Sequence, residues 1–124
     1  MQNEPKQLLL VDDSVLVIKR VALTLYDKLT NTNIISVLKG ADAVTAIDKF
    51  KPTVVLLDIN LPDISGIELL KQIRVGYPAI KVIMLTNQSK AHIRKICLQQ
   101  GAEGFYDKTR EFEKAIEHIK KLNQ

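Results

Sequence analysis

Five short apolar runs, separated by segments with helical spacing, constrain the fold of this 124-residue chain more than any other feature. The runs cover residues 8–11, 34–38, 54–57, 82–85 and 104–106, and they are apolar nearly throughout. Strands without polar alternation are typical of a sheet that is covered on both faces. We therefore expect five buried strands at these positions.

The segments between the runs have the pattern of amphipathic helices, in which apolar residues recur every three or four positions. The first segment follows Ser14, a residue suited to cap a helix, and the third follows Ser65-Gly66. Pro52 stops the second segment and Gly101 ends the fourth. The apolar positions are Val17, Val21, Leu25 and Leu29; Ala43, Ile47 and Phe50; Ile67, Leu70 and Ile73; Ile93, Ile96 and Cys97; and Phe112, Ile116, Ile119 and Leu122.

This alternation of strand and helix predicts an α/β fold, in which a doubly wound, five-stranded parallel sheet carries five helices on its two faces. The first, third and fourth strands fit neighbouring positions at the middle of such a sheet. Ligands bind beyond the carboxyl ends of the strands, at the point where the strand order reverses. The residues that follow the strands are therefore the first candidates for a functional site.

Length and composition limit the classes of protein that the chain can represent. We expect residues 1–124 to form a single domain, so that any output goes through a partner. No apolar run approaches the roughly 18 residues of a membrane span, and the first residues lack the layout of a secretory signal. Cys97 is the only cysteine, which excludes an intramolecular disulfide and favours a cytoplasmic location. The net charge of +4 is too small to indicate nucleic acid, and we expect no direct DNA binding by this domain.

Polar side chains follow four of the five expected strands. Asp12 and Asp13 follow the first strand, Asp58 the third and Thr86 the fourth, while Lys108 comes shortly after the fifth. Each residue alone has an ordinary structural explanation, such as a helix cap, a turn or a solvated charge. Because the carboxyl ends of parallel strands share one edge of the sheet, we instead expect these groups to converge there.

Electrostatics narrows the chemistry of such a cluster. Two carboxylates roughly 4 Å apart repel each other by about 4 kcal/mol at an effective dielectric constant of 20, and Lys108 supplies only one positive charge. With hard oxygen ligands and no nearby histidine or thiol, the cluster favours Mg²⁺, with Mn²⁺ as the second choice, over zinc. Carboxylates, a divalent cation, a lysine and a hydroxyl together indicate a phosphoryl-transfer site.

The motifs that carry these groups resemble those of a known family. LLLVDDS, LLDINLPDISGIELL, VIMLTNQ and GAEGFYDK are similar to the corresponding segments of the response regulator receiver domains of bacterial two-component systems, the chemotaxis-regulator (CheY-like) type. The resemblance covers nearly the whole chain. It implies a flavodoxin-like sheet with the strand order 2-1-3-4-5, and a phosphorylation-dependent switch in place of a turnover enzyme.

The resemblance also implies a role for each site residue. Asp58 would be the phosphoacceptor, phosphorylated by a sensor histidine kinase or a phosphotransfer protein. Mg²⁺ would be bound by Asp13, Asp58 and the backbone carbonyl of Asn60, and by Asp12 through water. Lys108 and Thr86 would hold the phosphoryl group. Phe105 would be the aromatic residue that rotates inward. The face made by the fourth helix, the fifth strand and the fifth helix would then bind a downstream protein.

Three features near Lys108 and Thr86 depart from the pattern of the family. The family has a proline after the lysine, in a cis bond, where this chain has Thr109. A cis bond before a residue other than proline costs about 3–4 kcal/mol, so we expect a trans bond, which puts a different loop around Lys108. We interpret Asp107 as a solvated turn residue, and Asn87 as a bulkier neighbour of the phosphoryl site than the family usually has.

Two further positions, Asn60 and Gln88, set in this family how fast the phosphoryl group is lost. Neither residue is acidic here, which argues against rapid self-hydrolysis.

Two rival functions stay open at this point. A constitutive docking module with a relic acceptor site is compatible with the change from proline to Thr109. A small metal-dependent phosphatase of the haloacid-dehalogenase kind would also use a strand-end aspartate, but it needs a second aspartate where this chain has Asn60. Reaction with acetyl phosphate and Mg²⁺ separates these functions from the switch.

Overall fold

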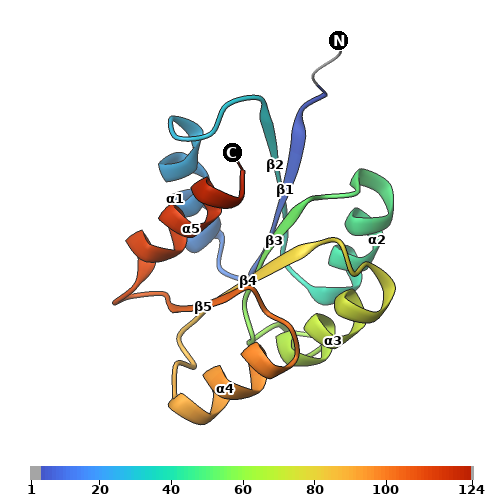
Figure 1. Ribbon diagram of the computed structural model, residues 1–124, viewed down its shortest axis with the longest axis vertical. Coiled ribbons are helices and arrows are strands. Elements are labelled where there is room, and N and C mark those ends of the chain that lie inside the picture. The colour runs from blue at the N-terminus through green and yellow to red at the C-terminus, as the bar shows by residue number, and fades with distance from the viewer. Residues whose placement is uncertain (1–3, 124) are drawn as a thin grey trace.

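A computed structural model describes residues 4–123 of the chain and shows one five-stranded sheet with five helices (Figure 1). All strand pairs are parallel, and the order is β2-β1-β3-β4-β5, as predicted. The elements are β1 Lys6–Val11, α1 Val15–Tyr26, β2 Thr32–Val37, α2 Gly40–Phe50, β3 Val54–Leu57, α3 Gly66–Gly76, β4 Lys81–Thr86, α4 Ala91–Gln99, β5 Gly104–Asp107 and α5 Phe112–Leu122. None of the helices within the described range is long and apolar enough to span a membrane.

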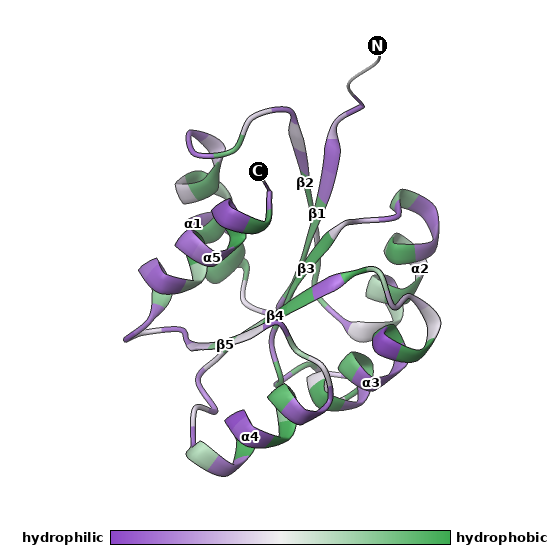
Figure 2. Cartoon of the chain, in the orientation of Figure 1, coloured by the Kyte–Doolittle hydropathy of each residue, from purple (hydrophilic) through white to green (hydrophobic). Residues whose placement is uncertain are grey.

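Apolar side chains from alternate positions of the strands form two cores, one on each face of the sheet. Helices α1 and α5 cover one face, and α2, α3 and α4 cover the other (Figure 1). In β1, for example, Leu9 and Val11 face α2 and α3, whereas Leu8 and Leu10 face α1 and α5. Figure 2 shows the apolar strands at the centre and the polar faces of the helices outside. The continuous apolar runs of the sequence therefore reflect burial on both faces.

Strand β2 is the exception to this pattern, because it lies at the edge of the sheet and pairs only with β1. Asn33 and Ser36 are exposed, and the other β2 side chains are only half-buried. The strand ends at Val37 and leaves Leu38 exposed, which corrects the predicted range of 34–38. Helix α1 likewise ends at Tyr26, so Leu29 packs from the following turn and does not continue the helical face.

The loops that bring α1, α2 and α3 to the sheet are held by side-chain caps. Ser14 Oγ accepts a hydrogen bond from the Val17 amide at the start of α1, and Ser65 Oγ accepts one from the Ile67 amide at the start of α3. The cap of α2 comes from another loop, because the Asp63 carboxylate accepts hydrogen bonds from the Gly40 and Ala41 amides, at 2.8 and 2.9 Å. Asp63 thereby ties the loop after β3 to the start of α2.

We expect Asp63→Ala to lower the thermal unfolding midpoint by a few degrees at pH 7. Hydrogen bonds from Ala41 and Gly40 hold the pKa of Asp63 below its ordinary value of 3.8. The stabilisation is therefore present above pH 3.8 and is lost as the pH falls through the lower folded-state pKa. Thermal unfolding of both proteins across the acidic range should show the two midpoints converging below pH 3.8; a constant difference would contradict this account.

Candidate functional site

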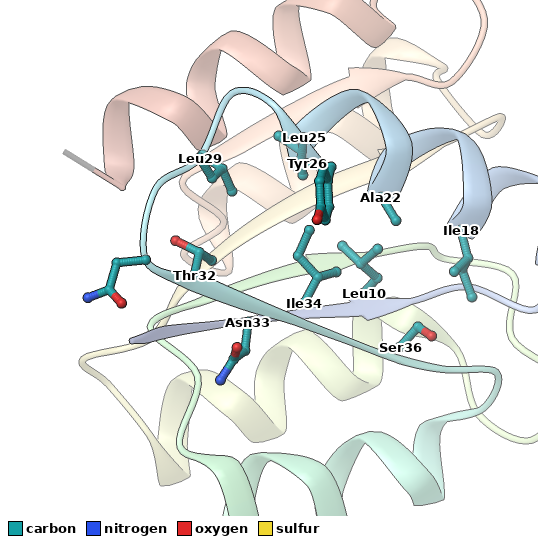
Figure 3. Close-up of a pocket in the computed structure, with 11 residues that line it drawn as sticks. Leu10, Ile18, Ala22, Leu25, Tyr26, Leu29, Thr32, Asn33, Ile34 and Ser36 are labelled. Atoms are coloured by element: carbon teal, nitrogen blue, oxygen red, sulfur yellow. The ribbon is translucent and has the colours of Figure 1, made fainter. Parts of the chain in front are cut away.

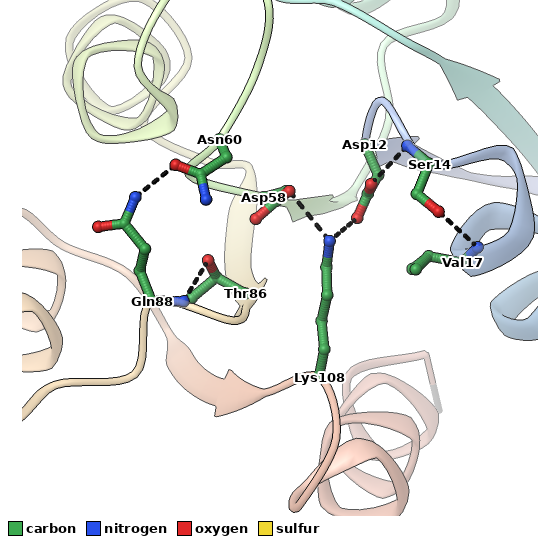
Figure 4. A network of polar contacts seen from close by, with 8 residues as sticks. All are labelled: Asp12, Ser14, Val17, Asp58, Asn60, Thr86, Gln88 and Lys108. Carbon is green, nitrogen blue, oxygen red and sulfur yellow. Dashed lines mark hydrogen bonds and ion pairs between the residues drawn. The ribbon is translucent and has the colours of Figure 1, made fainter.

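Five of the predicted site residues lie together at the carboxyl-terminal edge of the sheet, namely Asp12, Asp58, Asn60, Thr86 and Lys108 (Figure 4). Asp12 and Asp13 follow β1, and Asp58 follows β3, which is hydrogen-bonded to β1. Carboxylate oxygens of these three residues all lie within 4.8 Å of one another. Asp12 and Asp58 are buried, whereas Asp13 is exposed, so the cluster opens toward solvent on the Asp13 side.

Lys108 lies between two of the three carboxylates. Its Nζ is 2.7 Å from Asp12 Oδ2 and 3.0 Å from Asp58 Oδ2, and its side chain is 12% exposed. Burial alone would lower the pKa of Lys108, but the hydrogen bonds to Asp12 and Asp58 raise it above its ordinary value of 10.5. Lys108 is therefore a positive charge at every physiological pH.

The single positive charge of Lys108 does not neutralise the negative charge of all three carboxylates. Burial raises the pKa of Asp12 above its ordinary value of 3.8, although hydrogen bonds from Lys108 and from the Ser14 amide act in the opposite direction. Three carboxylates and one ammonium group leave an excess of negative charge in the cluster. A second cation would relieve this excess of negative charge.

Asp58 has one carboxylate oxygen that no other described residue contacts by a hydrogen bond. Its Oδ2 accepts from Lys108, while Oδ1 is buried and has no partner within residues 4–123. A buried unpaired oxygen is costly, so such a group is typical of a site that binds a ligand or an ion. Three carboxylates form a hard oxygen donor set, which fits Mg²⁺ or Mn²⁺.

Thr86 and Asn60 lie on the other side of Asp58 from Asp12 (Figure 4). Thr86 is fully buried at the end of β4, and its hydroxyl accepts a hydrogen bond from the Gln88 amide at 3.1 Å. Among residues 4–123 no group accepts the proton of this hydroxyl, so the proton is available for donation to a ligand. The side chain of Gln88 donates to Asn60 Oδ1, so these two neutral amides bridge the loops after β3 and β4.

Phe105 belongs to the core beneath α4 and is only 1% exposed. The guanidinium group of Arg94 donates a hydrogen bond of 2.8 Å to the Phe105 carbonyl and lies 5.9 Å from its ring. The aromatic ring therefore already occupies an inward position in this structure.

The loop after β5 corrects one prediction and confirms another. No cis peptide bond occurs among residues 4–123, so the Lys108–Thr109 bond is trans as expected. Asp107 is not a solvated turn residue: it is 9% exposed and accepts hydrogen bonds from the Ser89 hydroxyl and from two loop amides. Sequence patterns did not indicate Ser89 or Glu111, which also bonds to this loop, because neither belongs to a recognisable motif.

A groove of about 590 Å³ lies between α1 and β2, away from these residues (Figure 3). Leu10, Ile34 and apolar side chains of α1 line it, together with polar groups of β2. None of the predicted site residues is part of its lining. The groove results from the incomplete cover of the edge strand, and it is separate from the carboxylate cluster.

Comparison with known proteins agrees with the geometry. The family model described as the response regulator receiver domain matches residues 8–120. A probable transcriptional regulatory protein of Mycobacterium tuberculosis, TcrX, is 29% identical over 120 residues, which cover 97% of this chain and 50% of that protein. The chemotaxis protein CheY of Listeria monocytogenes is 33% identical over 82 residues, which cover 66% of this chain and 69% of that protein.

Among solved structures, the CheX–CheY–BeF3–Mg complex of Borrelia burgdorferi contains a chain with a TM-score of 0.86 and 29% identity. The alignment covers 96% of this chain and 90% of that one. The chain spans about half the length of the first curated relative, and the aligned residues make up 36% and 34% of the next two.

Proposed function

The chain belongs to the response regulator receiver domain family of two-component signalling, and we propose that it is a switch phosphorylated on Asp58. Receiver domains are signalling modules and in general not turnover enzymes. The unpaired, buried Oδ1 of Asp58, next to two further carboxylates and a lysine, is the observation that carries this proposal. It leaves a nucleophilic oxygen that no hydrogen bond within the described residues competes for.

In the proposed reaction, a carboxylate oxygen of Asp58 attacks the phosphorus of a phosphohistidine on a kinase or a phosphotransfer protein. An oxygen–phosphorus bond forms, the nitrogen–phosphorus bond breaks, and the partner's imidazole takes up a proton as it leaves. The product is an acyl phosphate on Asp58. Lys108 then pairs with a phosphoryl oxygen, and Thr86 donates its hydroxyl proton to another.

The metal-binding part of the proposal assigns Mg²⁺ to the acidic cluster. Asp13, Asp58 and the backbone carbonyl of Asn60 would hold it directly, and Asp12 would do so through water. Bound there, Mg²⁺ would neutralise the negative charge of the carboxylates and of the incoming phosphoryl group. The cluster of three carboxylates and the unpaired oxygen of Asp58 both support a cation at this position.

The output of the switch is proposed to be a changed protein-binding face on α4, β5 and α5. The phosphoryl group adds about two negative charges beside Thr86, whose hydroxyl gains a charge-assisted hydrogen bond if it moves closer. The acyl phosphate thereby biases an existing equilibrium between two arrangements of the loop after β4. Phe105 lies under α4 and would transmit this movement to the face. We further propose that the chain works in the cytoplasm.

One experiment tests this function against its rivals. The protein is incubated with acetyl phosphate, with and without Mg²⁺, and its intact mass is measured. A gain of one phosphoryl group that requires Mg²⁺ is expected for the switch. No gain would favour a constitutive docking module, and sustained hydrolysis of a phosphate ester would favour a phosphatase.

We expect Gln88→Glu to shorten the lifetime of the acyl phosphate by about an order of magnitude. In the native chain, the neutral side chains of Gln88 and Asn60 bond to each other, so no carboxylate orients an attacking water. A glutamate would replace the amide donor of Gln88 with a carboxylate that accepts a hydrogen bond from that water. The decay of phosphorylated protein after removal of acetyl phosphate measures the lifetime, and an unchanged decay would contradict this role for the pair.

A further inference from the structure

The carboxylate of Asp107 organises the loop that carries Lys108. Its Oδ1 accepts hydrogen bonds from the amides of Thr109 and Arg110, both at 2.8 Å. Its Oδ2 accepts from the Ser89 hydroxyl at 2.6 Å. Such a buried carboxylate with three donors is a fixed structural element of the loop.

These contacts hold the backbone on both sides of Lys108. Before it, Asp107 exchanges two hydrogen bonds with Glu111, because its amide donates to Glu111 Oε1 and its carbonyl accepts from the Glu111 amide. After it, the next two amides bond to the Asp107 carboxylate. The Lys108 amide itself donates to the Thr86 carbonyl at 3.0 Å. Little freedom remains in the direction in which the lysine side chain leaves the chain.

These backbone hydrogen bonds matter because lysine is a flexible side chain with a point charge at its end. The ammonium group has to lie between Asp12 and Asp58, 2.7 and 3.0 Å away, although its own loop has ordinary trans bonds and no proline. The hydrogen bonds from Ser89, Arg110 and Thr109 also lower the pKa of Asp107, so its carboxylate stays ionised. An ionised carboxylate holds amide and hydroxyl donors more strongly than a neutral acceptor does.

We propose that Asp107 is a positioning residue, which aims Lys108 at the carboxylate cluster by holding the loop from Lys108 to Glu111 and by linking it to Ser89. The inference deepens the proposed function, since it concerns the placement of the lysine that would pair with the phosphoryl group. Ser89 lies three residues after Thr86, so the Asp107 carboxylate ties the loop that follows Thr86 to the loop that carries Lys108.

The first test measures the placement of Lys108 without any ligand. Reductive methylation followed by peptide mass spectrometry gives the reactivity of each lysine. Asp107→Ala should raise the reactivity of Lys108 by about tenfold, because the loop loses the charge-assisted hydrogen bonds that the Asp107 carboxylate accepts. Asp107→Asn should raise the reactivity of Lys108 less than Asp107→Ala does, since its amide can accept from both loop amides and donate to Ser89 but carries no charge.

The second test measures two ligands that report on Lys108 in opposite directions. If the ammonium group leaves the cluster, Mg²⁺ should bind about fivefold more tightly, because a competing positive charge is gone. Beryllofluoride, a phosphoryl analogue, should bind about tenfold more weakly in the presence of Mg²⁺, because it loses its cationic partner. A variant that merely loosens the site would weaken both ligands. Titration calorimetry of Asp107→Ala distinguishes these outcomes.

Two controls complete the design. Asp63→Ala removes another carboxylate that accepts two backbone amides, and it should leave the reactivity of Lys108 unchanged. In a double-mutant cycle, Asp107→Ala should add nothing to Lys108→Ala, because the two changes act through the same side chain. Additive effects on the two ligands, or a reactivity of Lys108 that stays native in Asp107→Ala, would overturn the inference.

The methylation and titration experiments together also separate this inference from the proposed function. If the native protein bound no beryllofluoride with Mg²⁺ while Asp107→Ala still exposed Lys108 to methylation, the proposed function would fail and the positioning role would stand. If the native protein bound the analogue and the variant bound it equally well, the positioning role would fail alone.

Discussion

Asp58→Asn is expected to abolish phosphorylation by acetyl phosphate, with a loss of about a hundredfold or more in the rate of phosphoryl uptake. The substitution keeps the size of the side chain and an oxygen that can accept the Lys108 hydrogen bond, which is 3.0 Å long in the native protein. It removes the negative charge and the nucleophilic oxygen. The fold should therefore survive while the chemistry is lost.

Intact mass after incubation with acetyl phosphate and Mg²⁺ provides the measurement for this variant. Asp42→Asn, an exposed aspartate in the first turn of α2, is the matched control and should gain the phosphoryl group as the native chain does. Omission of Mg²⁺ should reduce phosphorylation of the native protein to a similar extent as the substitution. Phosphoryl uptake by Asp58→Asn at the native rate would show that the acceptor is another residue.

Most of the fold followed from simple features of the sequence. Continuous apolar runs such as 54–57 are found as strands buried on both faces, and Ser14 caps the helix that it was expected to cap. The weak points were the edge strand β2 and the last turn of α1. There, apolar residues such as Leu29 and Leu38 belong to connections, because local spacing does not show where tertiary packing ends an element.

The acidic cluster was also predictable, for a reason of topology. Parallel strands place their carboxyl ends at one edge, so Asp12, Asp13 and Asp58 had to converge once the strand order was right. The position of the Lys108 ammonium group was harder to predict, because it depends on a loop held by Asp107 and Ser89, which are 18 residues apart in the sequence. A contact between two ordinary polar residues leaves no periodic or motif signal.

A second large effect is expected for Gly66→Ala, at the point where α3 meets the acceptor strand. Gly66 is the first residue of α3, and its amide donates a hydrogen bond of 2.7 Å to the Ile59 carbonyl. A methyl group at this position would lie 2.0 Å from the Asp58 carbonyl oxygen and 2.6 Å from Ile59 Cα. Both atoms belong to the backbone, so no side chain can rotate to make room.

We therefore expect Gly66→Ala to reduce the free energy of unfolding by about 3 kcal/mol or more, measured by chemical denaturation. Gly76→Ala, at the other end of the same helix, is the matched control. Its methyl group would meet no atom within 4 Å, and alanine should stabilise α3 by about 0.5–1 kcal/mol. The pair separates the general cost of changing a helical glycine from the cost of moving the Asp58 backbone.

The same clash should also impair phosphorylation in the fraction of Gly66→Ala that stays folded. The atom in the way is the carbonyl oxygen of Asp58 itself, so any relaxation of α3 displaces the residue that has to face Asp12 and Lys108. Because positioning errors of about 1 Å can cost on the order of a hundredfold in rate, we expect slower uptake from acetyl phosphate at a temperature where the variant is folded. Native uptake together with reduced stability would mean that α3 moves as a unit and leaves the acceptor in place.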